Sequence, residues 1–309
     1  MQDAAPSPRS AALAVVAACM IWGLSPLYYV QLAHVPPIEV LAHRTLWSVL
    51  FFTGFCALTG RLPRLRAALG DGAEVRRLAL SAAMVSVNWG LFIWAVTTGR
   101  VAESALGYYI FPLVMTAAGA LFYGERLRAM QVVAIGLAAA ATAVLGYGAG
   151  APPWAPLALA FSFTAYGMIK RACASGPIVS VTVEVILLAP LAAAWLIGAH
   201  GWGWTDFTGG APGAFGRSWT EAALLVASGV ITGAPLALYS LAARGLPMST
   251  AGMIFYLNPT LQALMAYLLG EAPTLWRMIA FPMIWVGLAL YSADAARTER
   301  RRRRAARAA

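Results

Sequence analysis

Charged side chains inside long apolar segments are the first candidates for chemistry in this sequence. Arg44 lies six residues beyond Ile38, where an apolar segment begins, and this spacing places it about 9 Å along a helix. An arginine at the centre of a bilayer costs roughly 2.5–3.5 kcal/mol, so it normally faces an ionic partner or a wet cavity. Glu184 is its approximate counterpart in the second half of the chain. We therefore expect Arg44 and Glu184 to handle a carboxylate or a proton. The alternative for Arg44 is that its side chain snorkels to the outer headgroups.

Polar residues in other apolar segments are candidates for the lining of a polar pathway. Asn88 and Trp89 fall in the third segment, and Thr232 lies at the matching position of the eighth. An asparagine in such a helix bonds to a neighbouring helix more often than it lines a pathway. Glu103 and Ser104 begin the fourth segment. There Glu103 either takes part in ion coupling or simply lies at the positive end of a helix.

One sequence pattern occurs twice along the chain. Residues 107–112 and 252–259 each run from a glycine to a proline, and each is followed by an apolar run that ends in Gly-Glu. We expect helix breaks at Pro112 and Pro259, because proline frees a carbonyl that needs neighbouring protein or water. Aromatic and amide side chains beside the breaks, or at equivalent repeat positions, are candidates to bind a planar or amphipathic solute, with aromatic packing as the alternative. These are Trp22, Tyr108, Tyr166, Tyr256 and Asn258.

The elements that must position these residues are membrane helices. Hydrophobic residues make up 61% of the 309 and charged residues 11%, against about 25% charged in a soluble domain. Apolar segments long enough to cross a bilayer are predicted at 11–33, 38–58, 77–98, 101–123, 127–147, 153–170, 177–197, 220–243, 246–269 and 273–292. Ten segments divide into five plus five, so we predict an all-α membrane protein with an inverted repeat. Paired broken helices of this kind are typical of a secondary transporter.

The positive charges predict the orientation. With the N-terminus inside, most of the 22 Lys and Arg fall in cytoplasmic segments, and the expected outer loops hold only Arg100, Arg217 and Arg277. Both termini are therefore expected in the cytoplasm. The domains are then an N-terminal stretch at 1–10, five-helix repeats at 11–148 and 149–292, and a basic tail at 293–309. We expect the run of arginines at 300–304 to contact anionic lipid headgroups, and no nucleic acid.

Motifs for soluble chemistry are missing from the sequence. No phosphate-binding glycine loop is present, and the three cysteines and three histidines are dispersed, so we expect neither a cofactor nor a metal. An integral membrane enzyme using Glu39, His43 and Arg44 is an alternative, as is a non-transporting membrane subunit. The first lacks a clustered nucleophile, and the duplicated helix breaks argue against the second.

The motifs, taken in order, resemble the RarD branch of the EamA-type transporters, in the drug/metabolite transporter superfamily. The resemblance covers residues 11–292 and is carried by Ile21-Trp22-Gly23, His43-Arg44 with Trp47, Asn88-Trp89, Glu103-Ser104, Leu106-Gly107-Tyr108, Gly124-Glu125-Arg126, Tyr166-Gly167, Glu184, Pro259 and Gly270-Glu271. It implies a bacterial inner-membrane permease, an exporter by family habit, that moves a small polar or amphipathic metabolite by alternating access. The small residues Ala134, Ala138 and Ala141 indicate close helix packing or a homodimer contact.

Two features depart from the pattern of that family. Phe111 stands where RarD-like chains usually carry asparagine, which puts the solute preference in question. The stretch from Pro259 to Glu271 is also one residue shorter than that from Pro112 to Glu125, a shift that rotates the later residues of a helix by about 100°.

Overall fold

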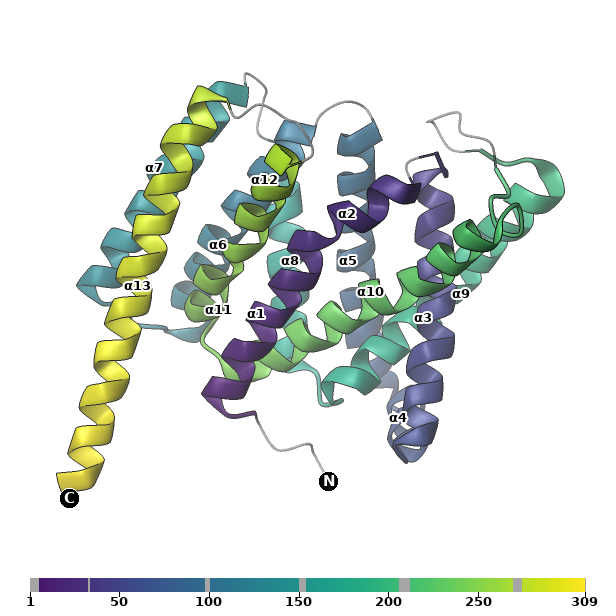
Figure 1. Ribbon diagram of the computed structural model, residues 1–309. Coiled ribbons are helices and arrows are strands. Elements are labelled where there is room, and N and C mark those ends of the chain that lie inside the picture. Colours follow the sequence, from purple (N-terminus) through teal and green to yellow (C-terminus); the bar gives the residue numbers. More distant parts are fainter. Residues whose placement is uncertain are drawn as a thin grey trace.

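Helices form all the regular secondary structure in the part of the chain that the structure describes (Figure 1). The computed structural model describes residues 6–32, 34–97, 101–149, 154–205, 212–268 and 274–308. The elements are α1 (Pro8–Leu24), α2 (Pro26–Tyr29), the 3₁₀ helix η1 (Val30–Leu32), α3 (Pro37–Leu58), α4 (Leu62–Gly70), α5 (Gly72–Thr97), α6 (Val101–Tyr123), α7 (Ala129–Ala149), α8 (Trp154–Ala172), α9 (Pro177–Trp202), α10 (Trp219–Gly245), α11 (Met248–Phe255), α12 (Leu257–Leu268) and α13 (Leu275–Ala308). The predicted all-α class is confirmed.

Six helical stretches among the described residues are long and apolar enough to cross a membrane. They are Pro8–Tyr29, Pro37–Leu58, Leu106–Tyr123, Ala129–Gly148, Pro177–Trp202 and Trp219–Gly245. The remaining predicted segments are helical as well, in α5, α8, α11 with α12, and α13. The protein is thus a helical membrane protein, whereas ten spans and an inverted repeat stay predictions.

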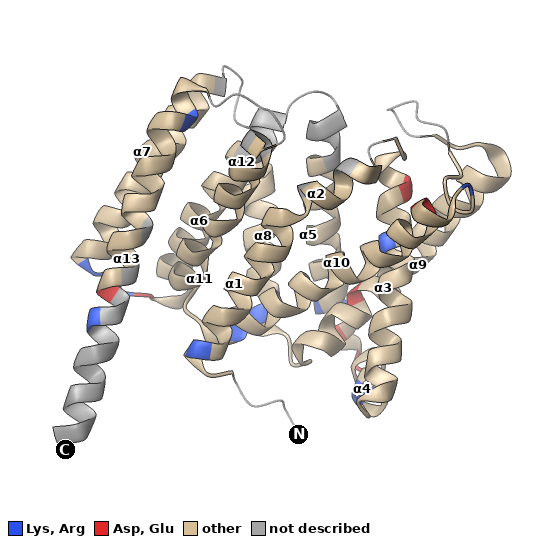
Figure 2. Cartoon of the chain, in the orientation of Figure 1, with Lys and Arg blue, Asp and Glu red and all other residues tan. Residues whose placement is uncertain are grey.

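The helices lie side by side in one bundle. α7 and α13 pack together at one edge, and α3 packs between α9 and α10 toward the other (Figure 1). In the middle, α1 contacts α10, α11 and α12, while α8 contacts α5 and α6. The start of α1 and the end of α13 lie at the same end of the bundle (Figure 1), and the coloured Lys and Arg positions gather toward that end (Figure 2).

Glycines allow close approaches between central helices. A Cβ atom on Gly23 in α1 would lie 2.5 Å from Cβ of Leu261 in α12. A Cβ atom on Gly107 in α6 would lie 2.9 Å from Cβ of Leu159 in α8. Neither site has room for a larger residue, so these two pairs of helices pack backbone against side chain.

The helix breaks differ from the predicted ones. α6 continues without interruption through Pro112, whose carbonyl oxygen accepts a hydrogen bond from Thr116 Oγ1 at 2.8 Å. The predicted break at Pro112 is therefore corrected to a proline inside a continuous helix, which neighbouring helices on both sides support. In the second half the chain does break, at Tyr256 between α11 and α12. Pro259 lies in the first turn of α12, where proline needs no hydrogen-bond partner for its nitrogen.

Carboxylates of the first half of the chain hold backbone N–H groups of the second half. Glu125 accepts from the backbone N–H of Met248 at 2.6 Å and of Ser249 at 3.0 Å, so it caps α11 rather than the helix that comes after it in sequence. Glu74, which precedes the apolar part of α5, accepts from Ala174 and Ser175 in the same way. Burial of Glu74 acts to raise its pKa, but these hydrogen bonds together with the charge of Arg77 outweigh it and hold the pKa below its usual value.

Candidate functional site

Arg44 is a partly buried cation with unused hydrogen-bond donors that are shielded from solvent. Its Nε and Nη2 atoms are inaccessible to solvent and have no hydrogen-bond partner among the described residues. Its guanidinium carbon lies 3.9 Å from the centroid of the Trp89 ring in α5, a cation–π contact. Tyr29 interacts with the guanidinium through a side-chain hydrogen bond as well as electrostatically, and Tyr108 interacts with it electrostatically. Helices α2, α3, α5 and α6 thus bring aromatic and phenolic groups around a cation that keeps two donors available, an arrangement suited to an anion.

Asn88 holds the helix that presents Trp89. Its Nδ2 donates to the carbonyl of Leu159 at 2.9 Å and to Oγ of Ser162 at 3.2 Å, both in α8. Asn88 is 1% exposed, so its amide is committed to this contact. The geometry fits the alternative in which Asn88 joins two helices, and it fixes the position of α5 at the next residue, Trp89.

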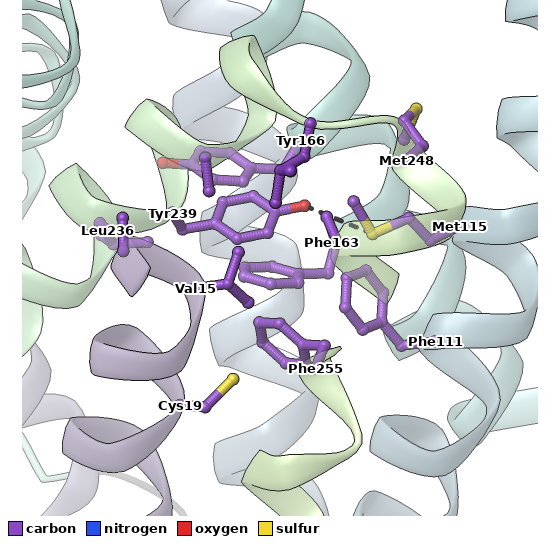
Figure 3. Packing of buried hydrophobic residues seen from close by; sticks show 14 of the residues in the cluster. Val15, Cys19, Phe111, Met115, Phe163, Tyr166, Leu236, Tyr239, Met248 and Phe255 are labelled. Carbon is purple, nitrogen blue, oxygen red and sulfur yellow. Dashed lines mark hydrogen bonds between the residues drawn. The ribbon is translucent and has the colours of Figure 1, made fainter. Parts of the chain in front are cut away.

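An aromatic cluster fills the middle of the bundle (Figure 3). Its members come from α1, α6, α8, α10 and α11: Trp22, Phe111, Phe163, Tyr166, Tyr239 and Phe255. Phe163 stacks on Tyr239 with ring centroids 5.1 Å apart, and Phe111 meets Phe255 edge-on at 4.7 Å. Trp22 and Tyr166 each contact Phe163 in this cluster, and Phe111 packs against Phe163 and Phe255.

Glu184 belongs to a second buried polar group, and its partner is Lys170. Lys170 Nζ lies 2.8 Å from Glu184 Oε1, with side chains 0% and 2% exposed. Glu184 also accepts from Ser81 at 2.5 Å and from the Tyr166 hydroxyl at 3.4 Å, while Lys170 donates to Ser180 at 2.7 Å. The structure thus joins Glu184 to Lys170 and gives no contact between Glu184 and Arg44.

Sequence reasoning missed Lys170, the last residue of the predicted segment 153–170, as a candidate. Its sequence does contain a signal. Tyr166 and Lys170 are four residues apart on α8, and Ser180 and Glu184 are four apart on α9, with only a short connection between the helices. Two such i, i+4 pairs beside a short connection between consecutive helices are placed to meet.

The other predicted residues lie apart from these groups. Thr232 is buried, and its Oγ1 has no hydrogen-bond partner among the described residues. Tyr256 packs among residues of α6, α7 and α13, and Asn258 accepts from Gln262 Nε2 at 3.2 Å. The carbonyl of Pro259 accepts from the Tyr109 hydroxyl at 3.4 Å. The side chains of Glu103 and Ser104 lie outside those that the structure describes.

A groove of about 710 Å³ runs over α3 and α10 on the outside of the bundle. It is lined by Trp47, Phe51, Phe215, Trp219, Ala222, Ala223, Val226, Ala227, Val230 and Ile231. This lining contains no charged side chain, so it offers nothing to orient a polar solute. Arg44 is the better starting point for a binding site.

Comparison with known proteins decides what kind of chain carries this geometry. Residues 9–147 match the EamA-like transporter family. Protein RarD of Streptomyces exfoliatus is 39% identical over 92% of this chain and 88% of its own length. Protein RarD of Escherichia coli K12 is 36% identical over 95% of this chain and 97% of its own. The chain belongs to the EamA-like transporter family. It is thereby a member of the drug/metabolite transporter superfamily.

Another relative and a solved structure extend the comparison for this EamA-family chain. An uncharacterized transporter of Pseudomonas aeruginosa is 37% identical over 92% of this chain and 93% of its own length. A solved crystal structure with 22% sequence identity superposes with a TM-score of 0.69 over 94% of this chain and 99% of the other. That likeness establishes that the EamA-family chain shares the fold of an experimentally determined protein.

Proposed function

We propose that this EamA-family protein is a secondary transporter that exports a small anionic metabolite across the bacterial inner membrane. The observation that carries the proposal is the buried guanidinium of Arg44, held over Trp89 with two nitrogens that have no partner among the described residues. A solute carboxylate would accept from both nitrogens, because guanidinium donors match carboxylate oxygens in a bidentate pair. Trp89 and Tyr108 would then contact the apolar part of the solute. The transporter relatives fit a chain without enzymatic activity.

The pattern of helix contacts supports ten spans in an inverted five-plus-five repeat. If the first five expected spans correspond to the last five, then α1 corresponds to α8 and α6 to α11 with α12. The contacts of α1 with α12 and of α8 with α6 are then equivalent, as are those of α10 with α3 and of α5 with α9. The close approaches at Gly23 and Gly107 fall in the first of these equivalent pairs. Such a repeat allows the two halves to rock about a central site.

The aromatic cluster supports a closed gate in this conformation. Arg44 lies in the third turn of α3 from its N-terminal end, whereas Tyr166 lies near the C-terminal end of α8, toward the basic end of the bundle. With that end in the cytoplasm, as the positive-inside rule favours, the cluster would seal the solute site from the cytoplasm. The Lys170–Glu184 pair lies beyond the cluster, and we assign it, rather than Arg44, the handling of a coupling proton.

Counterflow in proteoliposomes tests the proposal. Vesicles would be preloaded with a pool of amino acids and other small carboxylates, and a parallel set with the corresponding amides. We expect the wild type to exchange carboxylates and Arg44→Ala to lose this exchange. Arg44→Lys should retain part of it, because lysine keeps the positive charge but lacks the planar pair of donors that binds a carboxylate through two hydrogen bonds. Arg66→Ala, which removes an exposed arginine of α4, is the matched control and should exchange normally.

Two outcomes would contradict parts of the proposal. Equal exchange by wild type and Arg44→Ala would remove Arg44 from the solute site. Exchange of the amides as fast as of the carboxylates would remove the anionic class of substrate while leaving a transporter.

A further inference from the structure

Two histidines and a glutamate that are far apart in sequence meet near the N-terminal end of α3. Glu39 and His43 are one helical turn apart on α3, and His200 comes from the last turn of α9. One potential ligand atom from each lies within 4.8 Å of the others. The fold thus brings together His43 and His200, which are dispersed in the sequence.

The carboxylate of Glu39 is fixed in place by the backbone. Glu39 is 0% exposed, and its Oε2 and Oε1 accept from the N–H groups of Gly213 at 2.9 Å and Ala214 at 2.7 Å. Each carboxylate oxygen has a second lone pair, so both remain able to ligate. A ligand carboxylate that is itself held by outer hydrogen bonds is the usual arrangement in protein metal sites.

His43 presents a buried nitrogen without a partner. The residue is 5% exposed, and its Nε2 has no hydrogen-bond partner among the described residues. That nitrogen lies 3.9 Å from Glu39 Oε1, too far for a hydrogen bond. The imidazole stacks on the Phe215 ring, with centroids 5.0 Å apart, so its orientation is set. Burying an unpaired polar nitrogen costs free energy, which a bound cation would recover.

His200 completes the group from the solvent side. It is exposed, and its ring packs on Gly213, where a Cβ atom would lie 3.3 Å from Nδ1. Gly213 has a φ of +79°, which favours glycine. The short distance to the His200 ring is a second reason why a side chain is disfavoured at this position. Tetrahedral zinc with bonds near 2.0–2.1 Å needs ligand atoms roughly 3.4 Å apart. Glu39 Oε1 and His43 Nε2 lie 3.9 Å apart, so zinc binding requires a small shift of these two side chains, and the exposed His200 closes on them from the solvent side.

We propose that Glu39, His43 and His200 form a zinc site that fastens α3, α9 and residues 213–214 to one another. Two imidazole nitrogens and one carboxylate are a ligand set for zinc, whereas magnesium and calcium prefer oxygen ligands alone. The exposed side would leave the fourth position to water. This inference is independent of the substrate and of the direction of transport.

Thermal unfolding with and without metal tests the site. Purified protein carrying no polyhistidine tag, stripped with a chelator in detergent, would be heated with added ZnCl2 or MgCl2 while its tryptophan fluorescence is followed. We expect Zn2+ to raise the Tm of the wild type and Mg2+ to leave it unchanged, because a ligand that binds only the folded state stabilises it. Isothermal titration should give one Zn2+ per chain.

Histidine variants show whether the zinc acts at this site. His200→Gln alters an exposed residue, so it should fold, and it should bind Zn2+ about tenfold or more weakly. His43→Gln should behave likewise. His34→Gln is the matched control, since His34 is exposed and pairs with Glu221 at 2.7 Å, and it should bind Zn2+ like the wild type. The proposal would be overturned if Zn2+ left the Tm of the wild type unchanged. It would also be overturned if Zn2+ raised the Tm of His200→Gln as much as that of the wild type.

Discussion

Two cations inside the bundle, the buried Lys170 and the partly buried Arg44, show how the surroundings of a residue decide its use. The ammonium of Lys170 has a carboxylate at 2.8 Å and a serine hydroxyl at 2.7 Å. The guanidinium of Arg44 has an aromatic face and two nitrogens without partners among the described residues. A fully paired charge in a protein interior is held in place, whereas a charge with free donors can accept a ligand. The Lys170–Glu184 pair is thus suited to a structural or proton-handling role, whereas Arg44 is the candidate for solute binding.

The Lys170–Glu184 pair predicts an asymmetric response to mutation. Lys170→Met leaves Glu184 without its cation in a buried position, and the expected loss of stability is about 3–5 kcal/mol. The double variant Lys170→Met with Glu184→Leu removes both charges and should lose much less. Thermal unfolding in detergent, followed by tryptophan fluorescence, compares them.

An exposed ion pair supplies the control for that comparison. Arg128 lies 3.4 Å from Asp294 with its side chain 46% exposed, so Arg128→Gln should change stability by only about 0–1 kcal/mol. Equal losses in the single and double variants would mean that the pair is not the source of the destabilisation.

The sequence identifies a candidate residue when the residue itself is costly to place in a membrane. It does not identify a partner that comes from a distant part of the chain. The membrane cost of Arg44 is visible in the sequence, and it identified a residue whose Nε and Nη2 find no partner in the described part of the chain. The i, i+4 spacing of Glu39 and His43 is visible too, but His200 joins them only through the packing of α9. Asn88 could bond to a neighbour or line a pathway, and only the position of α8 shows that its amide is satisfied by Leu159 and Ser162.

At the scale of elements, helix contacts depend on a few positions without side chains. Gly23→Ala would place a Cβ atom 2.5 Å from that of Leu261 and 3.3 Å from the carbonyl oxygen of Asn258. Because α12 would have to move, we expect a loss of about 1–3 kcal/mol. Gly90→Ala is the matched change in α5, where a Cβ atom meets nothing within 4 Å.

The control should move in the opposite direction. Alanine replaces glycine within a helix at a gain of about 0.5–1 kcal/mol when there is space, so Gly90→Ala should raise the Tm while Gly23→Ala lowers it. The same unfolding assay measures both. Equal shifts for the two variants would show that the contact between α1 and α12 is looser than the distances indicate.

The elements themselves follow largely from the sequence, and their breaks do not. Apolar length places the helices because every backbone polar group in a bilayer must be satisfied within the protein. A proline only permits a break: α6 passes straight through Pro112, while the chain breaks at Tyr256, ahead of Pro259. Which outcome occurs depends on the neighbours of the freed carbonyl, and these belong to other helices.

For the whole molecule, the distribution of charge bears on which side of the membrane each end of the bundle faces. The start of α1 and the helix α4 lie at the end where Lys and Arg gather, and this bias favours the cytoplasm for that end (Figure 2). The opposite end holds the last turn of α9 and the start of α13. Single cysteines at one end should therefore be reached from one side of the membrane only.

Labelling with a membrane-impermeant maleimide tests this arrangement. Arg9→Cys and Ala67→Cys should react in inside-out vesicles, whereas Gly201→Cys and Thr274→Cys should react in intact spheroplasts; all four positions are exposed. The native cysteines Cys19, Cys56 and Cys173 are buried, so the unmodified chain serves as the unlabelled control. Labelling of Arg9→Cys from outside would mean that the molecule has the opposite orientation in the membrane. The aromatic cluster would then close the site toward the outside. Labelling of Arg9→Cys and Ala67→Cys from opposite sides would remove one of the first two spans, and with it the five-plus-five repeat on which alternating access depends.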